Sequence, residues 1–115
     1  MARSFRSQTT EKYQCPQCQN AREFHEVHRN WQCPVCDHKV RIRLEIDGFA
    51  HACYRLTPGQ LKVGEIVTLE NEHIHEVLAI TKNGRQYRIA LKSYTSIIFN
   101  EDEIITQIDG GWYLD

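Results

Sequence analysis

Two copies of the four-residue unit Cys-Pro-x-Cys constrain this chain more than any other feature of its sequence. The units span residues 15–18 (CPQC) and 33–36 (CPVC), and fourteen residues separate them. Each unit favours a tight turn that points two sulfur atoms the same way, because its proline fixes one backbone angle. Two such turns, joined by a connection of hairpin length, place four thiolates around one metal ion. The predicted metal ligands are Cys15, Cys18, Cys33 and Cys36.

The cysteine count also favours a metal over disulfides. The chain has five cysteines, so pairing them would leave one thiol over. Its first residues are polar and basic and lack the apolar stretch of a signal peptide, and no run approaches the ~20 apolar residues of a membrane-spanning helix. We therefore expect a cytoplasmic protein with no membrane partner, and paired cysteines in a reducing compartment typically bind metal. A redox role is disfavoured, because one Cys-x-x-Cys unit suffices for that chemistry.

The segment from Tyr13 to Leu44 resembles the zinc-ribbon superfamily. The two cysteine pairs carry this resemblance together with Trp31, because ribbons often have an aromatic residue just before the second pair. The chain differs after each pair, where ribbons frequently have glycine and this chain has Gln19-Asn20 and Asp37-His38. Asn and Asp adopt left-handed backbone conformations more readily than most residues, so we expect both turns to be preserved.

This resemblance implies zinc as the cofactor. Four thiolates occupy every position of a tetrahedral zinc ion, at about 2.3 Å per bond, so no position is open to water or substrate. We therefore expect a structural site, which stabilises a segment too short to build a sufficient core. Iron in a rubredoxin-like site is the alternative metal, although rubredoxins normally have glycine after the cysteine pair and a longer connection between the pairs.

Hydrophobic alternation predicts an all-β chain. From Val40 to Ile46 apolar and charged residues alternate strictly, which is typical of a strand with one buried face. Asp47-Gly48 predicts a turn, and His51 to Leu56 a returning strand. Together with the cysteine pairs, these strands predict a zinc ribbon with an extended hairpin over residues 13–56. Residues 1–12 are expected to form a flexible tail.

Residues 57–115 are predicted to form a separate small β-barrel. Its clearest signal is Asn83-Gly84, which favours a type I′ turn between strands at residues 76–82 and 85–91. In that register Ile80 faces Tyr87, and Leu78 faces Ile89.

The rest of this segment is expected to contain short strands and turns. Thr57–Gln60 predicts a type II turn, and further strands are predicted at residues 65–70, 96–99 and 103–108, with an acidic turn before the last. The pattern is similar to an SH3-like barrel, and an OB-type roll is the alternative.

Basic residues concentrate in the first part of the chain. Residues 1–43 contain eight basic and four acidic residues, whereas residues 44–115 contain six and eleven. One face of the predicted strand at residues 40–46 is cationic, which suits phosphate contacts, although a solvated strand face is the alternative interpretation. Trp31 is a candidate for base stacking or for packing the ribbon. The candidate residues for binding nucleic acid or a partner are Lys39, Arg41, Arg43, Arg22, Arg29 and Trp31.

No catalytic constellation is evident among the remaining polar residues. His51 and Cys53 share one strand face, and His73 and His75 share another, but a buried thiol and surface imidazoles are the simpler interpretations. Three histidines near the cysteine pairs are not needed as ligands, because four thiolates already satisfy zinc: His25, His28 and His38.

These features lead us to expect a non-enzymatic adaptor or interaction module in a larger assembly, including assemblies that handle nucleic acid. This expectation rests on analogy with the roles of zinc ribbons and SH3-like barrels. The expected partner is a protein, and no small-molecule substrate is expected. The alternative is direct nucleic-acid binding through the basic face of the ribbon.

Overall fold

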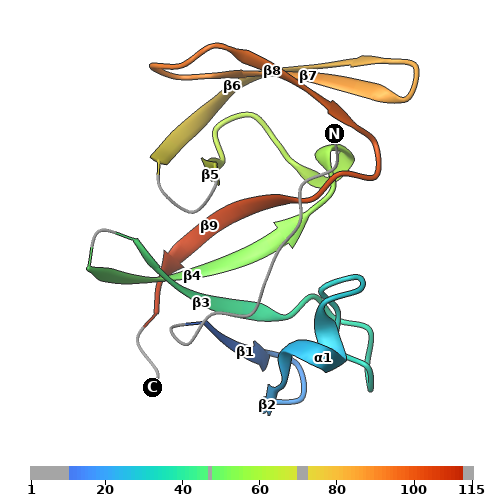
Figure 1. The fold of residues 1–115 in the computed structure, drawn as a ribbon, viewed down its shortest axis with the longest axis vertical. Coiled ribbons are helices and arrows are strands. Elements are labelled where there is room, and N and C mark those ends of the chain that lie inside the picture. Colours follow the sequence, from blue (N-terminus) through green and yellow to red (C-terminus); the bar gives the residue numbers. More distant parts are fainter. Residues whose placement is uncertain (1–10, 47, 70–72, 113–115) are drawn as a thin grey trace. The chain divides into compact units, whose positions relative to one another are not determined.

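The chain is all-β, as its hydrophobic alternation predicts. A computed structural model describes residues 11–46, 48–69 and 73–112. Nine strands, one four-residue helix and one short 3-10 helix lie within these ranges (Figure 1). Most of the predicted tail (residues 1–10, with Phe5) and the C-terminal Tyr113 lie outside them.

The chain divides into two compact units. One is Arg55–Ile108, which we call the hairpin unit. The other, which we call the cysteine unit, contains the described residues 11–54 and 109–112. The sequence predicted a division at residues 56 and 57, and did not predict that residues 109–112 belong with the cysteines.

The cysteine unit has an antiparallel sheet in the strand order β2-β1-β3-β4, with a single-turn helix after β2 (Figure 1). Near the chain's C-terminus, Trp112 donates a backbone hydrogen bond of 3.2 Å to Ala50 of β4. The elements are β1 (Lys12–Cys15), β2 (Asn20–Arg22), α1 (Phe24–Val27), β3 (Arg41–Ile46) and β4 (Phe49–Leu56).

Strand β3 forms the core of this unit. The predicted inward face is confirmed, because four apolar side chains at alternate positions are buried: Val40, Ile42, Leu44 and Ile46. Burying each such side chain contributes roughly 1.5–3 kcal/mol. The predicted returning strand is also present as β4, which pairs Cys53 opposite Ile42. Gly48 has φ +83°, as a turn requires, while its predicted partner Asp47 lies outside the described residues.

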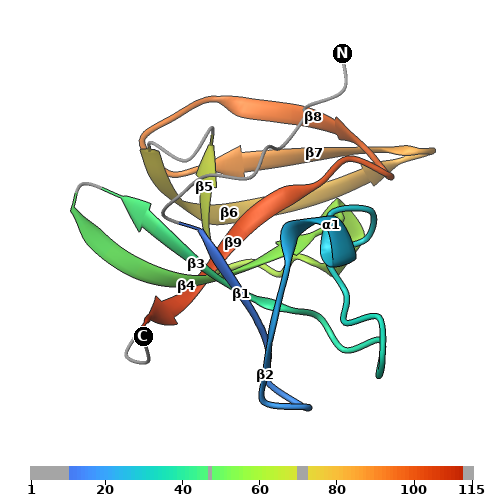
Figure 2. The ribbon, with the colours of Figure 1, turned by 60° about the horizontal axis from the view of Figure 1, so that its bottom comes forward.

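In the hairpin unit the antiparallel strand order is β9-β5-β6-β7-β8, and Figure 2 shows β6, β7 and β8 as neighbouring strands. Its core is apolar and includes Val67, Val77, Ile89 and Phe99, each at most 2% exposed. The strands are β5 (Ile66–Leu69), β6 (His73–Asn83), β7 (Gln86–Leu91), β8 (Ser96–Asn100) and β9 (Ile105–Gly111), the last of which continues into the cysteine unit.

The turn at Thr57–Gln60 differs from the type II turn that the sequence predicts. Pro58–Gln60 forms a 3-10 helix, and Gly59 lacks the positive φ that a type II turn requires. The side chains of Thr57 and Gln60 explain the difference. The Thr57 amide donates to Gln60 Oε1 at 2.9 Å, and the Gln60 amide in turn donates to the Thr57 side chain. This capping box stabilises a helical turn.

The predicted register of the β6–β7 hairpin is wrong. Asn83 pairs with Gln86, so the two turn residues are Gly84 and Arg85, and Ile80 faces Ile89 instead of Tyr87. Gly84 has φ +63°, whereas Asn83 is not among the residues with positive φ. A turn with glycine at its first central position is a favoured hairpin turn too, and here it replaces the Asn-Gly type I′ turn. From Ala79 to Asn83 the shift changes each cross-strand partner, but a shift of two residues keeps each side chain on its predicted face.

A β-bulge in β6 overturns the prediction for Leu78. Val77 pairs with Leu91 and Ala79 with Ala90, so Leu78 is an extra residue and is 49% exposed. Val77 and Ile80 are three residues apart, and regular alternation would place them on opposite faces. The bulge allows both to face the core side, with Val77 fully buried.

Replacing Gly84 by alanine tests the turn. We expect Gly84→Ala to lower the free energy of unfolding by about 1–2 kcal/mol, because alanine is strained at positive φ. Asn83→Ala is the matched control and should change it by less than about 0.5 kcal/mol. Urea denaturation of the metal-loaded protein measures both. Equal losses for the two variants would instead indicate a type I′ turn with Asn83 at positive φ.

Candidate metal centre

The first cysteine pair lies at the tip of the β1–β2 hairpin. Cys15 ends β1 and pairs with Asn20, the first residue of β2. The Gln19 amide donates to the Cys15 carbonyl at 2.8 Å, and the Cys18 amide lies 3.3 Å from Cys15 Sγ. Gln19 has φ +59°, so the residue directly after the pair takes the left-handed conformation that glycine adopts easily. The turn therefore forms without glycine.

The second pair repeats this geometry with different residues. The Cys33 amide donates to the His38 carbonyl at 2.8 Å, and the Asp37 amide donates to the Cys33 carbonyl at 2.9 Å. Asp37 has φ +62°, and an isolated bridge between Gln32 and Lys39 closes the strand ends. Both turns are therefore preserved, with Asp37 in the left-handed conformation as expected. In the first turn Gln19 takes that conformation instead of Asn20, which begins β2.

The two tips bring all four predicted sulfur atoms together. The four Sγ atoms lie within 4.8 Å of one another, and Cys15 Sγ lies 3.4 Å from Cys36 Sγ. A tetrahedral ion with 2.3 Å metal–sulfur bonds needs sulfur atoms ~3.8 Å apart, so the cluster fits a metal ion with small adjustments. Cys15 and Cys33 are buried, Cys18 is half-buried and Cys36 is exposed; all four thiols are free.

The thiols differ in how readily they lose a proton. Burial raises the pKa of Cys33, but the backbone amides of Cys36 and Val35 and the thiols of Cys15 and Cys36 lower it, to about 6. For Cys36 the backbone at His38 lowers the pKa, while burial and the other three thiols raise it to about 12. A hydrogen bond with Cys36 lowers the pKa of Cys18, yet burial and the remaining thiols leave it raised. Of the three thiols Cys18, Cys33 and Cys36, Cys33 alone has a lowered pKa and most readily forms a thiolate.

Aromatic rings pack beside the cluster. Tyr13, Phe24 and Trp31 have ring centroids 6.0 to 6.1 Å apart, and Trp31 is 3% exposed. The Trp31 amide donates to Val27 of α1, and the Val40 amide donates to the Trp31 carbonyl. Trp31 was a candidate for base stacking, and its observed contacts are those of a packing residue.

The cationic face of β3 includes residues that the sequence did not single out. Arg41 and Arg43 share this face and are half-buried, and the exposed Lys12 of β1 pairs with Arg43. Arg43 Nη2 lies 3.7 Å from Glu45 Oε2. The Arg41 guanidinium lies 5.8 Å from the ring centroid of Trp112. The polar alternation through Lys12 and Gln14 was the available signal for Lys12, whereas no local signal links Trp112 to Arg41.

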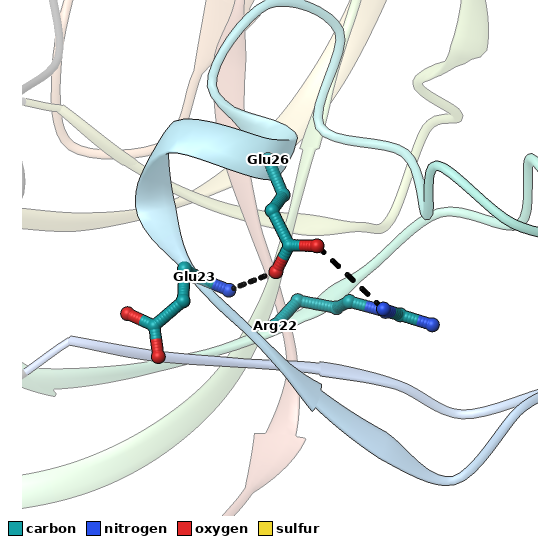
Figure 3. Close-up of polar contacts among 3 residues, drawn as sticks. All are labelled: Arg22, Glu23 and Glu26. Carbon is teal, nitrogen blue, oxygen red and sulfur yellow. Dashed lines mark hydrogen bonds and ion pairs between the residues drawn. The ribbon is translucent and has the colours of Figure 1, made fainter.

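The other predicted basic residues lie elsewhere in the cysteine unit. Lys39 is half-buried in the bridge with Gln32, and Arg29 is exposed after α1. Arg22 ends β2, and its Nη1 lies 3.7 Å from Glu26 Oε2 (Figure 3). Burial lowers the pKa of Arg22, but Cys33, Glu26 and Cys18 together raise it. The six candidates therefore do not form one surface.

The histidines and the fifth cysteine form no further metal site in the described ranges, where the four cysteines are the one group of three or more potential ligands that could hold an ion. His73 and His75 have ring centroids 6.5 Å apart, and His75 Nδ1 lies 3.0 Å from the Lys92 carbonyl. Cys53 is buried, as predicted. In the same part of the chain we find no helix with the length and apolar character needed to cross a membrane.

Replacing a cluster cysteine tests the assignment of the ligands. We expect the purified full chain to hold one metal ion, and Cys15→Ser to reduce metal content sharply because serine is a poor ligand for a soft thiolate site. Cys53→Ser, the matched control, should retain full metal content, because Cys53 lies outside the cluster. Elemental analysis by mass spectrometry gives the stoichiometry and the identity of the metal. Equal metal loss in both variants would contradict the assignment.

Metal affinity should fall as the pH is lowered, because protons compete for the thiolates. Cys36, with a pKa of about 12, must release its proton at any pH near neutral. Cys33 has a pKa of about 6 and is already ionised at pH 7, so it adds a further proton to the competition only below about pH 6. We therefore expect the logarithm of affinity to fall more steeply below pH 6. Competition with a chelator across this range measures the slope, and a pH-independent affinity would exclude thiolate ligation.

Comparison with other proteins adds no relative. No protein-family model matches the chain, and no curated protein or solved structure matches it either. The chemistry of the cysteine cluster and the surfaces of the described residues are therefore the features that point to a function.

Proposed function

We propose that the chain is a non-enzymatic zinc-binding interaction module. The observation that carries this proposal is the cluster of four thiols within 4.8 Å of one another. Tetrahedral coordination by four thiolates suits zinc, and it leaves no position for a substrate or an activated water. The metal would then hold two hairpin tips together, and function would reside on the surrounding protein surface.

Two structural features support a zinc ribbon followed by an SH3-like barrel as the architecture of this module. Each cysteine pair lies in a turn closed by antiparallel pairing, with a left-handed residue directly after the pair. The hairpin unit contains consecutive antiparallel strands around an apolar core, which is compatible with a small barrel. The zinc ribbon has stronger support than the SH3-like barrel, because its turn geometry is repeated in two turns of different sequence.

A protein is the partner that we propose for the cationic face of β1 and β3, where Lys12 is exposed and Arg41 and Arg43 are half-buried. This face presents Lys12, Arg41 and Arg43, which favours an acidic surface. Two of these cations already have neighbours, since Arg43 contacts Glu45 and Arg41 lies over Trp112. An arginine beside an aromatic ring is typical of protein interfaces. The excess of acidic residues after residue 43 would also weaken attraction to a phosphate backbone.

Direct nucleic-acid binding is the second candidate, and one observation favours it. Lys12 pairs with Arg43, and Gln14 pairs with Arg41, so cationic and amide side chains lie on one strand face. Such a face can contact phosphate oxygens without reading bases. Binding of this kind would weaken steeply with salt.

Affinity capture with and without nuclease separates the two candidates. We expect the full zinc-loaded chain to retain its protein partners after nuclease treatment, and the double variant Lys12→Glu and Arg41→Glu to lose them. Arg85→Glu is the matched control, because Arg85 lies in the turn of the hairpin unit with a side chain 91% exposed, and it should retain the partners.

The opposite outcome supports the second candidate. Loss of the captured proteins on nuclease treatment would contradict the adaptor role, provided that the purified chain also binds a nucleic acid with an affinity that falls steeply with salt. If metal content is full and neither proteins nor nucleic acid are retained, the proposed interaction role fails while the metal site stands.

A further inference from the structure

Arg22 lies on the side of the β1–β2 hairpin that faces the cysteine cluster. Tyr13 pairs with Arg22 and Cys15 pairs with Asn20, and directly opposed residues of an antiparallel pair project from the same face. The Arg22 side chain is 14% exposed, which is unusually low for an arginine. Its Nε atom is buried and lacks a hydrogen-bond partner among the described atoms. A charged group in this position needs a negative partner.

The cluster supplies that partner. Beside this geometry, Cys33 and Cys18, one from each cysteine pair, raise the pKa of the Arg22 guanidinium, as nearby sulfur atoms that stabilise its charge would do. Four thiolates around a divalent ion carry a net charge of about −2, so a nearby cation reduces the repulsion among the sulfur atoms. Arg22 offers several N–H donors in one plane, which allows it to reach more than one sulfur.

Glu26 fixes the guanidinium in this place. One carboxylate oxygen, Oε2, lies 3.7 Å from Arg22 Nη1, and the other, Oε1, accepts the Glu23 amide at 2.9 Å (Figure 3). The second contact belongs to the capping box of α1, so the helix start positions the carboxylate and the carboxylate positions Arg22.

We propose that Arg22 is a positioning residue of the metal centre, whose guanidinium donates hydrogen bonds to the Cys33 and Cys18 sulfur atoms and slows loss of the metal. This inference rests on the proposed function, because it requires that the four cysteines hold an ion. Outer contacts of this kind orient ligands and tune the electron density on the ligand atoms. Arg29 is exposed to solvent, and we propose no contact between it and the cysteines.

The rate of zinc release tests the role of Arg22. We expect Arg22→Gln to release zinc to excess chelator roughly 10–100-fold faster than the native chain, because removing an outer-sphere partner typically weakens metal affinity by this factor. Arg22→Lys should show an intermediate rate, because it keeps the charge but loses the planar donors. Arg29→Gln, the matched control, should leave the rate within about twofold, because surface substitutions away from a site have small effects.

The absorption spectrum of the cobalt-substituted protein is a second measurement, and a general loss of stability does not change it. Removing a hydrogen bond from a thiolate raises the energy of its electrons, so Arg22→Gln should shift the sulfur-to-cobalt charge-transfer band to lower energy. The same band should be unchanged in Arg29→Gln. If Arg22→Gln fails to fold, the comparison is made with Arg22→Lys, for which a smaller shift in the same direction is expected.

The outcomes separate this inference from the proposed function. A native chain that binds no metal overturns both. A native chain that binds one ion, with release rates and cobalt spectra unchanged in the Arg22 variants, overturns the role of Arg22 alone. Faster release with an unchanged charge-transfer band also overturns it, because that result indicates a general loss of stability.

Discussion

The structure of the cysteine unit depends on bringing four sulfur atoms close together. The two pairs are separated by fourteen residues, and each lies in a turn that is closed by backbone hydrogen bonds. Closure requires a left-handed residue after the pair, and Gln19 and Asp37 accept that conformation at a cost of roughly 1–2 kcal/mol each. Metal binding of the strength found in small thiolate sites, about 10 kcal/mol or more, would exceed this cost. The two strained turns and the cysteine cluster therefore depend on each other.

Aromatic rings pack on the same segments that bring the four sulfur atoms together. Tyr13 precedes the first cysteine pair in β1, and Trp31 precedes the second, so the same two segments that carry the ligands also carry the rings. Phe24 of α1 contacts both rings. The inward face of β3 extends this apolar layer, since Ile42 pairs with Tyr13.

Sequence patterns predicted the parts of the structure that depend on local chemistry. The cysteine pairs identified the cluster, and the alternation from Val40 to Ile46 identified the buried face of β3. The register of the β6–β7 hairpin was predicted wrongly because the sequence allows two different turns at the same place. Asn83-Gly84 allows a turn centred on either Asn83-Gly84 or Gly84-Arg85, and pairing of Ile80 with Ile89 accompanies the second. Leu78 was misplaced because a bulge breaks the period of two, and the contact between Arg41 and Trp112 joins residues too distant in sequence for any local pattern.

The cations of the cysteine unit differ in burial, and burial separates their roles. Arg22 is largely buried, and a charge removed from water is tolerated only beside groups of opposite sign. Glu26 is one such group, and Cys33 and Cys18 also raise the pKa of Arg22. Lys12 is exposed to water, so its charge does not need a neighbour of opposite sign. Arg41 and Arg43 are intermediate, because an aromatic ring and a carboxylate already lie beside them. A basic sequence therefore does not imply one basic surface. Under the proposed function, the buried cation would stabilise the metal centre, and the cations on the cationic face of β1 and β3 would contact a partner.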